Sequence, residues 1–232
     1  MPEITVASYN IHKGIGVDRR RDLSRIADVI GELRADVVAL QEADARFGDR
    51  QGLLDLDLLA DLGLKRVEVM GLRERSHGWH GNVMLVRRDV EVENVERIPL
   101  PGLEPRGAIV ADLIVYGTPL RAIGTHLALL GSSRIRQVTA VLDRLAALAD
   151  RPTVLMGDTN EWRRGNWTLK GLLPHFPSSP TAPSFPAPFP VLPLDRIMLS
   201  RGSVKDFAPH RSALSRRASD HLPVRARLVL PE

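Results

Sequence analysis

Six short motifs of acidic, amide and histidine residues each lie at the end of an apolar, strand-like segment. Together they supply hard oxygen ligands, amide donors and imidazoles from segments that are far apart in the chain. Such a set suits a divalent cation and a phosphate ester, so we predict a metal-dependent phosphoesterase. The motifs are Ser8-Tyr9-Asn10-Ile11-His12, Gln41-Glu42, Gly124-Thr125-His126-Leu127, Gly157-Asp158-Thr159-Asn160, Leu194-Asp195-Arg196-Ile197 and Ser219-Asp220-His221-Leu222-Pro223-Val224.

Asp158 and Asn160 lie two residues apart after the apolar run 153–156. In an extended segment both side chains point to the same side. One could polarise an attacking water while the other orients that water or holds a phosphate oxygen. The alternative is an Asx turn after Gly157, which is a common local structure.

Two histidines and an aspartate extend this set. His221 follows Asp220, and an imidazole beside a carboxylate can act as an acid, a base or a phosphate ligand near neutral pH. Asp195 opens a mostly apolar strand and could orient an imidazole from another segment. His126 ends a further apolar strand. The competing interpretation is a capping aspartate with two core histidines.

The remaining candidates are ligands for a metal or a phosphate. Glu42 ends an apolar run, where a carboxylate can serve as one of the few protein ligands of Mg²⁺. Asn10 could hold a metal-bound water or a phosphate. The other candidates for phosphate contacts are His12 with its neighbour Lys13, Arg106 and Asn82. The alternative for Glu42 is an ordinary ion pair with an arginine at the end of a strand, and the alternative for Asn10 is a turn residue.

Composition limits the chemistry. The chain has no cysteine, which excludes disulfides, thiolate metal sites and a cysteine nucleophile. No Walker-type loop, dinucleotide fingerprint or Gly-x-Ser-x-Gly elbow is present. The net charge is only +4, but all except four of the 32 basic residues are arginine, which suits bidentate phosphate contacts. A compositional bias spread over solvated faces would explain the arginines equally well.

The length of 232 residues favours one large domain but also permits two small ones. Because no convincing domain boundary is visible along the chain, we predict one domain over residues 1–232. The chain enters a strand-like run at Glu3 without a leader pattern, and no apolar stretch approaches 18 residues. We therefore expect no transmembrane segment, a cytoplasmic location and a monomer.

Hydrophobic periodicity predicts several consecutive strands flanked by a few helices. This pattern favours an α+β fold of two packed sheets with helices outside. Asp22 is the expected N-cap of the first helix, and Ile135, Val138, Val141, Leu142, Leu145 and Leu148 are the expected inward face of the third. The expected helices are 22–34, 53–62 and 132–149, and the expected strands are 3–11, 36–40, 82–87, 90–98, 107–116, 120–125, 153–156, 194–199, 204–208 and 222–230.

The stretch 174–193 is rich in proline and contains Phe176, Phe185 and Phe189. It connects Asn160 with Asp195, two residues that must meet at the phosphate. We therefore expect a stiff loop that borders the active site, with Phe185 and Phe189 in contact with the substrate. The alternative is that these rings only anchor the loop.

The motifs, taken in order, resemble those of the endonuclease/exonuclease/phosphatase superfamily, with its deoxyribonuclease-I-like fold. The Gly157-Asp158-Thr159-Asn160 and Ser219-Asp220-His221-Leu222-Pro223-Val224 blocks carry most of this resemblance, which covers essentially the whole chain. Thr159 differs from the phenylalanine that is more common at that position. The resemblance implies a four-layer α/β/β/α sandwich of two mainly antiparallel sheets with outer helices. It also implies Mg²⁺-dependent (or Mn²⁺-dependent) hydrolysis of a phosphate ester.

The resemblance also implies roles for individual residues. Glu42 would be the principal metal ligand, with Asn10 and Asp220 nearby. The remaining roles are Asp158 and Asn160 at the attacking water, the Asp195–His221 pair at the phosphate, and His126 at the phosphate or leaving group. Whether His221 or Asp158 acts as the base stays open at this point.

The substrate class also stays open between a nucleic acid, a phospholipid and a small molecule. A nucleic acid would suit the basic and aromatic residues Trp162, Arg163, Arg164, Trp167, Arg216 and Arg217. A lipid would suit an apolar lip of Phe176, Phe185, Phe189 and Val191. The alternative to a hydrolase is a catalytically inactive binding module of the same fold that contacts nucleic acid or protein.

Overall fold

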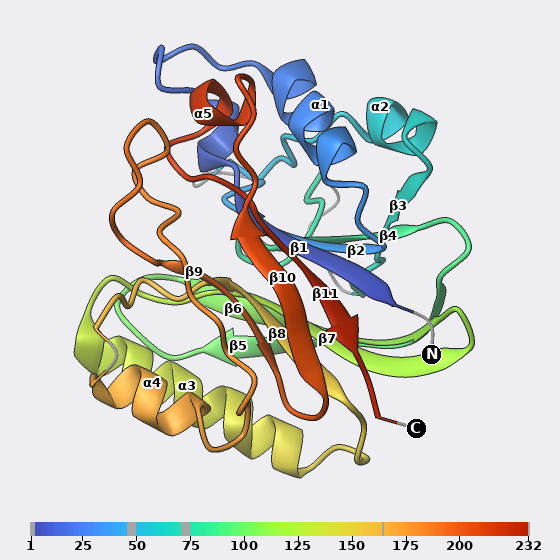
Figure 1. Ribbon diagram of the computed structural model, residues 1–232, viewed down its shortest axis with the longest axis vertical. Coiled ribbons are helices and arrows are strands. Elements are labelled where there is room, and N and C mark those ends of the chain that lie inside the picture. Colours follow the sequence, from blue (N-terminus) through green and yellow to red (C-terminus); the bar gives the residue numbers. More distant parts are fainter. Residues whose placement is uncertain (1–2, 46–49, 71–74, 164, 232) are drawn as a thin grey trace.

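Two β-sheets pack face to face, and helices cover the outer face of each sheet (Figure 1). This computed structural model describes residues 3–45, 50–70, 75–163 and 165–231. The layers therefore follow the order helix, sheet, sheet, helix, which confirms the predicted α/β/β/α sandwich.

The first sheet has six strands in the order β10-β11-β1-β2-β4-β3. Its central strand β1 (Ile4–Asn10) runs parallel to β2 (Val37–Gln41) and antiparallel to β11 (Val224–Val229). The remaining strands are β3 (Leu64–Arg66), β4 (Val83–Arg87) and β10 (Ser203–Pro209).

The second sheet has five strands in the order β5-β6-β7-β8-β9. Only the pair β7–β8 is parallel, and α3 (Gly131–Ala146) forms the crossover between these two strands. The strands are β5 (Glu91–Leu100), β6 (Arg106–Val115), β7 (Thr118–His126), β8 (Thr153–Asp158) and β9 (Asp195–Leu199).

The main core lies between the sheets, where aliphatic side chains of both inner faces interdigitate. A second cluster packs α1 (Leu23–Leu33), α2 (Leu56–Asp61) and α5 (Ser215–Ala218) on the six-stranded sheet. A third packs α3 and α4 (Trp167–Leu172) on the five-stranded sheet. The central strands β1, β2 and β8 are buried on both faces, so they are almost continuously apolar until the polar residues at their ends.

Most predicted elements are present, and Asp22 caps α1 by accepting a hydrogen bond from the Arg25 amide at 2.9 Å. The predicted inward face of α3 is wrong at Ile135, which is 41% exposed, while Arg134 and Gln137 are buried. The reason is hydrogen bonding: Gln137 accepts from the Ala128 amide, and Arg134 pairs with a buried carboxylate described below. The patterns did not predict β3 or α4, which are too short for a clear periodicity.

In the part of the chain that the structure describes, no helix combines the length and apolar character needed to cross a membrane.

Candidate active site

Strand pairing gathers the polar motifs at one edge of the sandwich. In the five-stranded sheet His126, the last residue of β7, lies opposite Asp158, the last residue of β8. Asp158 in turn lies opposite Asp195, the first residue of β9. Gly157 makes this pairing possible, because its φ is +154° and a Cβ there would lie 1.9 Å from the Thr125 carbonyl oxygen.

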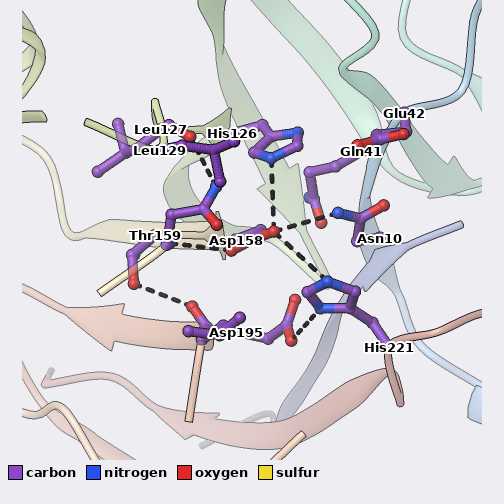
Figure 2. Close-up of polar contacts among 12 residues, drawn as sticks. Asn10, Gln41, Glu42, His126, Leu127, Leu129, Asp158, Thr159, Asp195 and His221 are labelled. Carbon is purple, nitrogen blue, oxygen red and sulfur yellow. Dashed lines mark hydrogen bonds and ion pairs between the residues drawn. The ribbon is translucent and has the colours of Figure 1, made fainter. Parts of the chain in front are cut away.

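The carboxylate of Asp158 lies at the centre of these polar contacts (Figure 2). Asp158 is only 2% exposed. Its Oδ2 accepts a hydrogen bond from Asn10 Nδ2 at 3.1 Å, across the interface between the two sheets. The Nε2 atoms of His126 and His221 lie 3.4 Å and 3.7 Å from the same oxygen. Its Oδ1 accepts the Asn160 backbone N–H at 2.9 Å. The structure thus brings four other predicted residues to the Asp158 carboxylate.

His221 is held between two carboxylates. Its Nδ1 lies 2.9 Å from Asp195 Oδ2, while its Nε2 faces Asp158. Ser184 donates its hydroxyl to the same oxygen of Asp195 at 2.6 Å. The ring of Phe185 packs on the His221 ring with 4.8 Å between centroids. Hydrogen bonding and ring packing therefore both fix the orientation of the imidazole.

The surroundings shift the pKa values of these groups. Burial raises the pKa of Asp158 to about 6; the charge of His221 opposes this effect and that of Asp195 adds to it. Burial works against the charged form of His221 as well, but the charge and hydrogen bond of Asp195, with Asp158 adding, raise its pKa to about 10. The imidazole is therefore protonated at neutral pH.

Glu42 directly follows β2, and its carboxylate pairs with the ammonium group of Lys13. Burial opposes its charge, yet the hydrogen bond and charge of Lys13 hold the pKa of Glu42 below its usual value. His12 Nδ1 lies 3.7 Å from an oxygen of Asp220. A negative, oxygen-rich position that already attracts a cation fits a hard divalent metal ion.

Non-glycine residues with left-handed backbone are concentrated here. Positive φ values of 45°, 57°, 53° and 50° occur at His12, Lys13, Glu42 and Asn160. Each such residue costs on the order of 1–3 kcal/mol, and surrounding structure must hold it in place. This concentration is typical of a functional site.

Two predicted phosphate contacts lie to one side. Arg106, which opens β6, pairs with Glu104 at 2.7 Å and lines a pocket shared with Glu42 and His126. Asn82 is 1% exposed and donates its amide to the backbone oxygens of Trp79 and Gly107. The latter bond attaches Asn82 to the strand that begins at Arg106.

The proline-rich stretch borders the site, as its position in the sequence predicts. Phe185 reaches His221, and the amide of Ala187 donates to the Asp220 carbonyl oxygen at 2.7 Å. Phe189 and Val191 are 82% and 67% exposed. The expected place of Phe176 in an apolar lip is wrong, because it is 1% exposed and packs with α3 and α4 in the core.

The proposed nucleic-acid surface is only partly organised. The Arg163 guanidinium lies 5.5 Å from the Trp162 ring, and the Lys170 ammonium lies 4.9 Å from the Trp167 ring. Arg164 lies outside the described residues.

The sequence patterns did not predict the buried ion pair between Glu161 and Arg134, which lies next to the site. Glu161, 1% exposed, receives Arg134 Nη2 at 2.8 Å, and its backbone oxygen accepts from Arg196 Nη2 at 3.1 Å. Arg134 also donates to the Ala128 and Leu129 carbonyl oxygens. These bonds tie the turn after Asp158 to the connection after β7. Glu161 directly follows Asn160, which was the one available signal.

Comparisons with known proteins agree with this architecture. The family model described as endonuclease/exonuclease/phosphatase matches residues 7–221. The uncharacterised protein YbhP of Escherichia coli K12 is 29% identical over 244 residues, which cover 97% of this chain and 96% of YbhP.

Two solved structures share the fold. An endonuclease/exonuclease/phosphatase of Beutenbergia cavernae is 24% identical with a TM-score of 0.73, covering 99% of this chain and 72% of its own. A mannosyl-6-phosphatase of Bacteroides thetaiotaomicron is 18% identical with a TM-score of 0.72, covering 98% of this chain and 100% of its own.

We predict that Glu161→Gln destabilises the fold by about 3–5 kcal/mol, because it leaves the buried Arg134 guanidinium without its counter-charge. Urea unfolding followed by circular dichroism measures this effect. The matched control is Asp150→Asn, which breaks the exposed Arg201–Asp150 pair and should cost at most about 1 kcal/mol. Equal losses in the two variants would contradict a supporting role for the buried pair.

Proposed function

The chain belongs to the endonuclease/exonuclease/phosphatase family, whose members are phosphoesterases, and on that premise we propose that it hydrolyses a phosphodiester with Mg²⁺ or Mn²⁺. The observation that carries the proposal is the buried Asp158 carboxylate, which faces the Asp195–His221 pair on the same edge of the sandwich as Glu42.

We assign the cation to Glu42, with Asn10 and Asp220 nearby. The donors are hard oxygen ligands, and the Glu42 carboxylate already holds the ammonium group of Lys13. When bound, the cation would neutralise charge on the phosphate and stabilise the leaving oxygen.

A second acidic cluster, Asp158, Asp195 and His221, has ligand atoms within 4.8 Å of one another. We assign this cluster to proton transfer and phosphate binding instead, because Asp195 and His221 already bond to each other at 2.9 Å.

The proton steps follow from the placement of His221 between two carboxylates. A protonated imidazole cannot accept a proton from water, but it can donate a hydrogen bond to a phosphate oxygen from Nε2. Asp158 then takes the proton from the attacking water. The backbone N–H of Asn160 donates a hydrogen bond to Asp158 Oδ1, and this bond fixes the plane of the carboxylate.

His126, Arg106 and His12 complete the proposed phosphate site. His126 lies 3.4 Å from Asp158 Oδ2, and Arg106 lines the pocket that His126 shares with Glu42. His12 Nδ1 lies 3.7 Å from Asp220, and the His12 backbone N–H donates to Asn10 Oδ1, so His12 lies beside two of the assigned metal ligands. Asn82 supports the start of β6, which carries Arg106, through its bond to Gly107.

The first test is turnover of bis(p-nitrophenyl) phosphate. We expect turnover that depends on Mg²⁺ or Mn²⁺, disappears with excess chelator and returns with added metal. Glu42→Gln should raise the metal concentration needed for half-maximal rate, because it removes a charged ligand. The exposed Glu91→Gln, at the start of β5, is the control. Full activity in excess chelator would exclude the proposed mechanism, and no turnover with either metal would favour the binding module.

Asp158→Asn and His221→Asn should each lower kcat on the order of 10²–10⁴-fold, because each removes a group that handles a proton or charge in the transition state. Steady-state kinetics of the single and double variants measures this effect. Because the two side chains act on one reaction centre, the combined loss should fall well short of the product of the single losses. Folded variants with near wild-type kcat would show that the cluster is structural.

Substitutions of Phe185 and of Phe189 should affect activity differently. Phe185→Ala should lower kcat on every substrate, because the ring packs on His221. Phe189→Ala should leave the small aryl diester unaffected and weaken only substrates that extend to the exposed ring. Kinetics on the aryl diester and on the best substrate from a panel of DNA, RNA, phospholipids and sugar phosphates measures both effects. An equal loss on both substrates in Phe189→Ala would mean that the loop is only scaffolding.

A further inference from the structure

A polar pocket adjoins the proposed phosphate site. It shares Glu42 and His126 with that site and extends to Asp44, Arg50 and His80, residues to which the proposed mechanism assigns no role. Its volume is about 50 Å³, and it opens to solvent at its mouth. The pocket is therefore placed to receive a group that is esterified to the phosphate.

The charges in this pocket are balanced. Lys13 pairs with Glu42 and Arg106 pairs with Glu104, so the cations beside the phosphate site are matched by carboxylates. Arg50 and Asp44 add one charge of each sign. A second phosphate would need an excess of positive charge, which the described lining residues do not provide.

Asp44 supplies an unused hydrogen-bond acceptor. Its side chain is buried, at 6% exposed, and its Oδ2 has no hydrogen-bond partner among the described residues. A buried carboxylate oxygen without a hydrogen-bond partner destabilises the protein, so a hydrogen bond from a ligand to this oxygen would be favourable. Gly81 forms the adjacent wall with φ of +82°, and a Cβ there would lie 3.1 Å from Asp44 Oδ1. The absence of a side chain at position 81 therefore lets the backbone approach the Asp44 carboxylate closely.

Arg50 and His80 supply donors. Arg50 Nη1 donates to His80 Nδ1 at 2.7 Å, which leaves the imidazole hydrogen on Nε2. Burial, together with the charges of Arg50 and Arg97, lowers the pKa of His80 to about 4, so the ring is neutral at physiological pH. The pocket thus places N–H donors beside the buried, unpartnered Oδ2 atom of Asp44.

From these contacts we infer that the pocket binds a neutral polyhydroxylated group, such as a sugar ring, that is esterified to the phosphate. Hydroxyls both donate and accept, so they match a carboxylate oxygen set beside a guanidinium and a neutral imidazole. An acyl chain would need an apolar wall, and Gly81 and Pro105 are the only non-polar residues among the lining residues that the structure describes. The inference names the substrate class of the proposed phosphoesterase and rests on that function.

The test measures binding, so that it does not depend on turnover. Two non-hydrolysable probes are compared by calorimetry in Mg²⁺: the methylene phosphonate analogues of hexose 6-phosphate and of cyclohexylmethyl phosphate. We expect the hexose analogue to bind about tenfold or more tightly, because only its hydroxyls satisfy Asp44 and Arg50. Asp44→Asn and Arg50→Gln should each bring the ratio of the two Kd values to within about twofold of one. The exposed Asp57→Asn, on α2, should keep the wild-type ratio.

Equal affinities for the two probes in the wild-type protein, or no measurable binding of the hexose analogue at millimolar concentration, would overturn the inference. So would an unchanged ratio in Asp44→Asn with a weakened Mg²⁺ affinity, since Asp44 would then be a cation ligand. Melting temperatures of both variants show that the fold is retained, and Arg50→Gln decides the matter if Asp44→Asn does not fold. Turnover of the aryl diester is assayed separately, so its absence would remove the proposed function without changing the binding result.

Discussion

The buried carboxylate of Asp158 is the group on which the arrangement of the site depends. An isolated ion at 2% exposure would cost several kcal/mol, and the carboxylate is tolerated because hydrogen-bond donors and imidazoles surround it. Asn10 and the Asn160 amide donate hydrogen bonds, while His126 and His221 bring imidazoles close. A second buried carboxylate, Asp195, keeps His221 charged, so that two negative groups share one cation.

This balance of charge requires backbone positions that only the complete sandwich provides. Asn10 belongs to the six-stranded sheet and Asp158 to the five-stranded sheet, so their hydrogen bond crosses the main core. The apolar cluster between the sheets holds them together, and none of its members is a polar residue of the site. The proline-rich stretch adds a hydrogen bond from Ser184 to Asp195 and the packing of Phe185 on His221, so it holds this pair in place.

The residues of this site that could be predicted from the sequence are those with a local signature. Asp158, His126 and Asp195 each adjoin an apolar run, and strand periodicity predicts that such residues meet at a sheet edge. The layers follow from the same periodicity. Ser184, Glu161 with Arg134, and the core position of Phe176 had no such signature. Their environments depend on contacts between distant segments. From the sequence alone, an arginine on an amphipathic helix is predicted to be exposed, because its buried partner is not known.

The large sequence separation between residues of the site affects the stage of folding at which the site forms. Asn10 lies near the beginning of the chain and His221 near its end, and β1 becomes central only when β11 pairs with it, joining Ile4 to Leu228. Ser219 then donates its hydroxyl to the Asn10 carbonyl oxygen, a bond between residues 209 positions apart. Contacts of such long range form late and slowly. A chain still emerging from the ribosome therefore carries Asn10 long before the segment 219–221, which completes the arrangement of the site, has been synthesised.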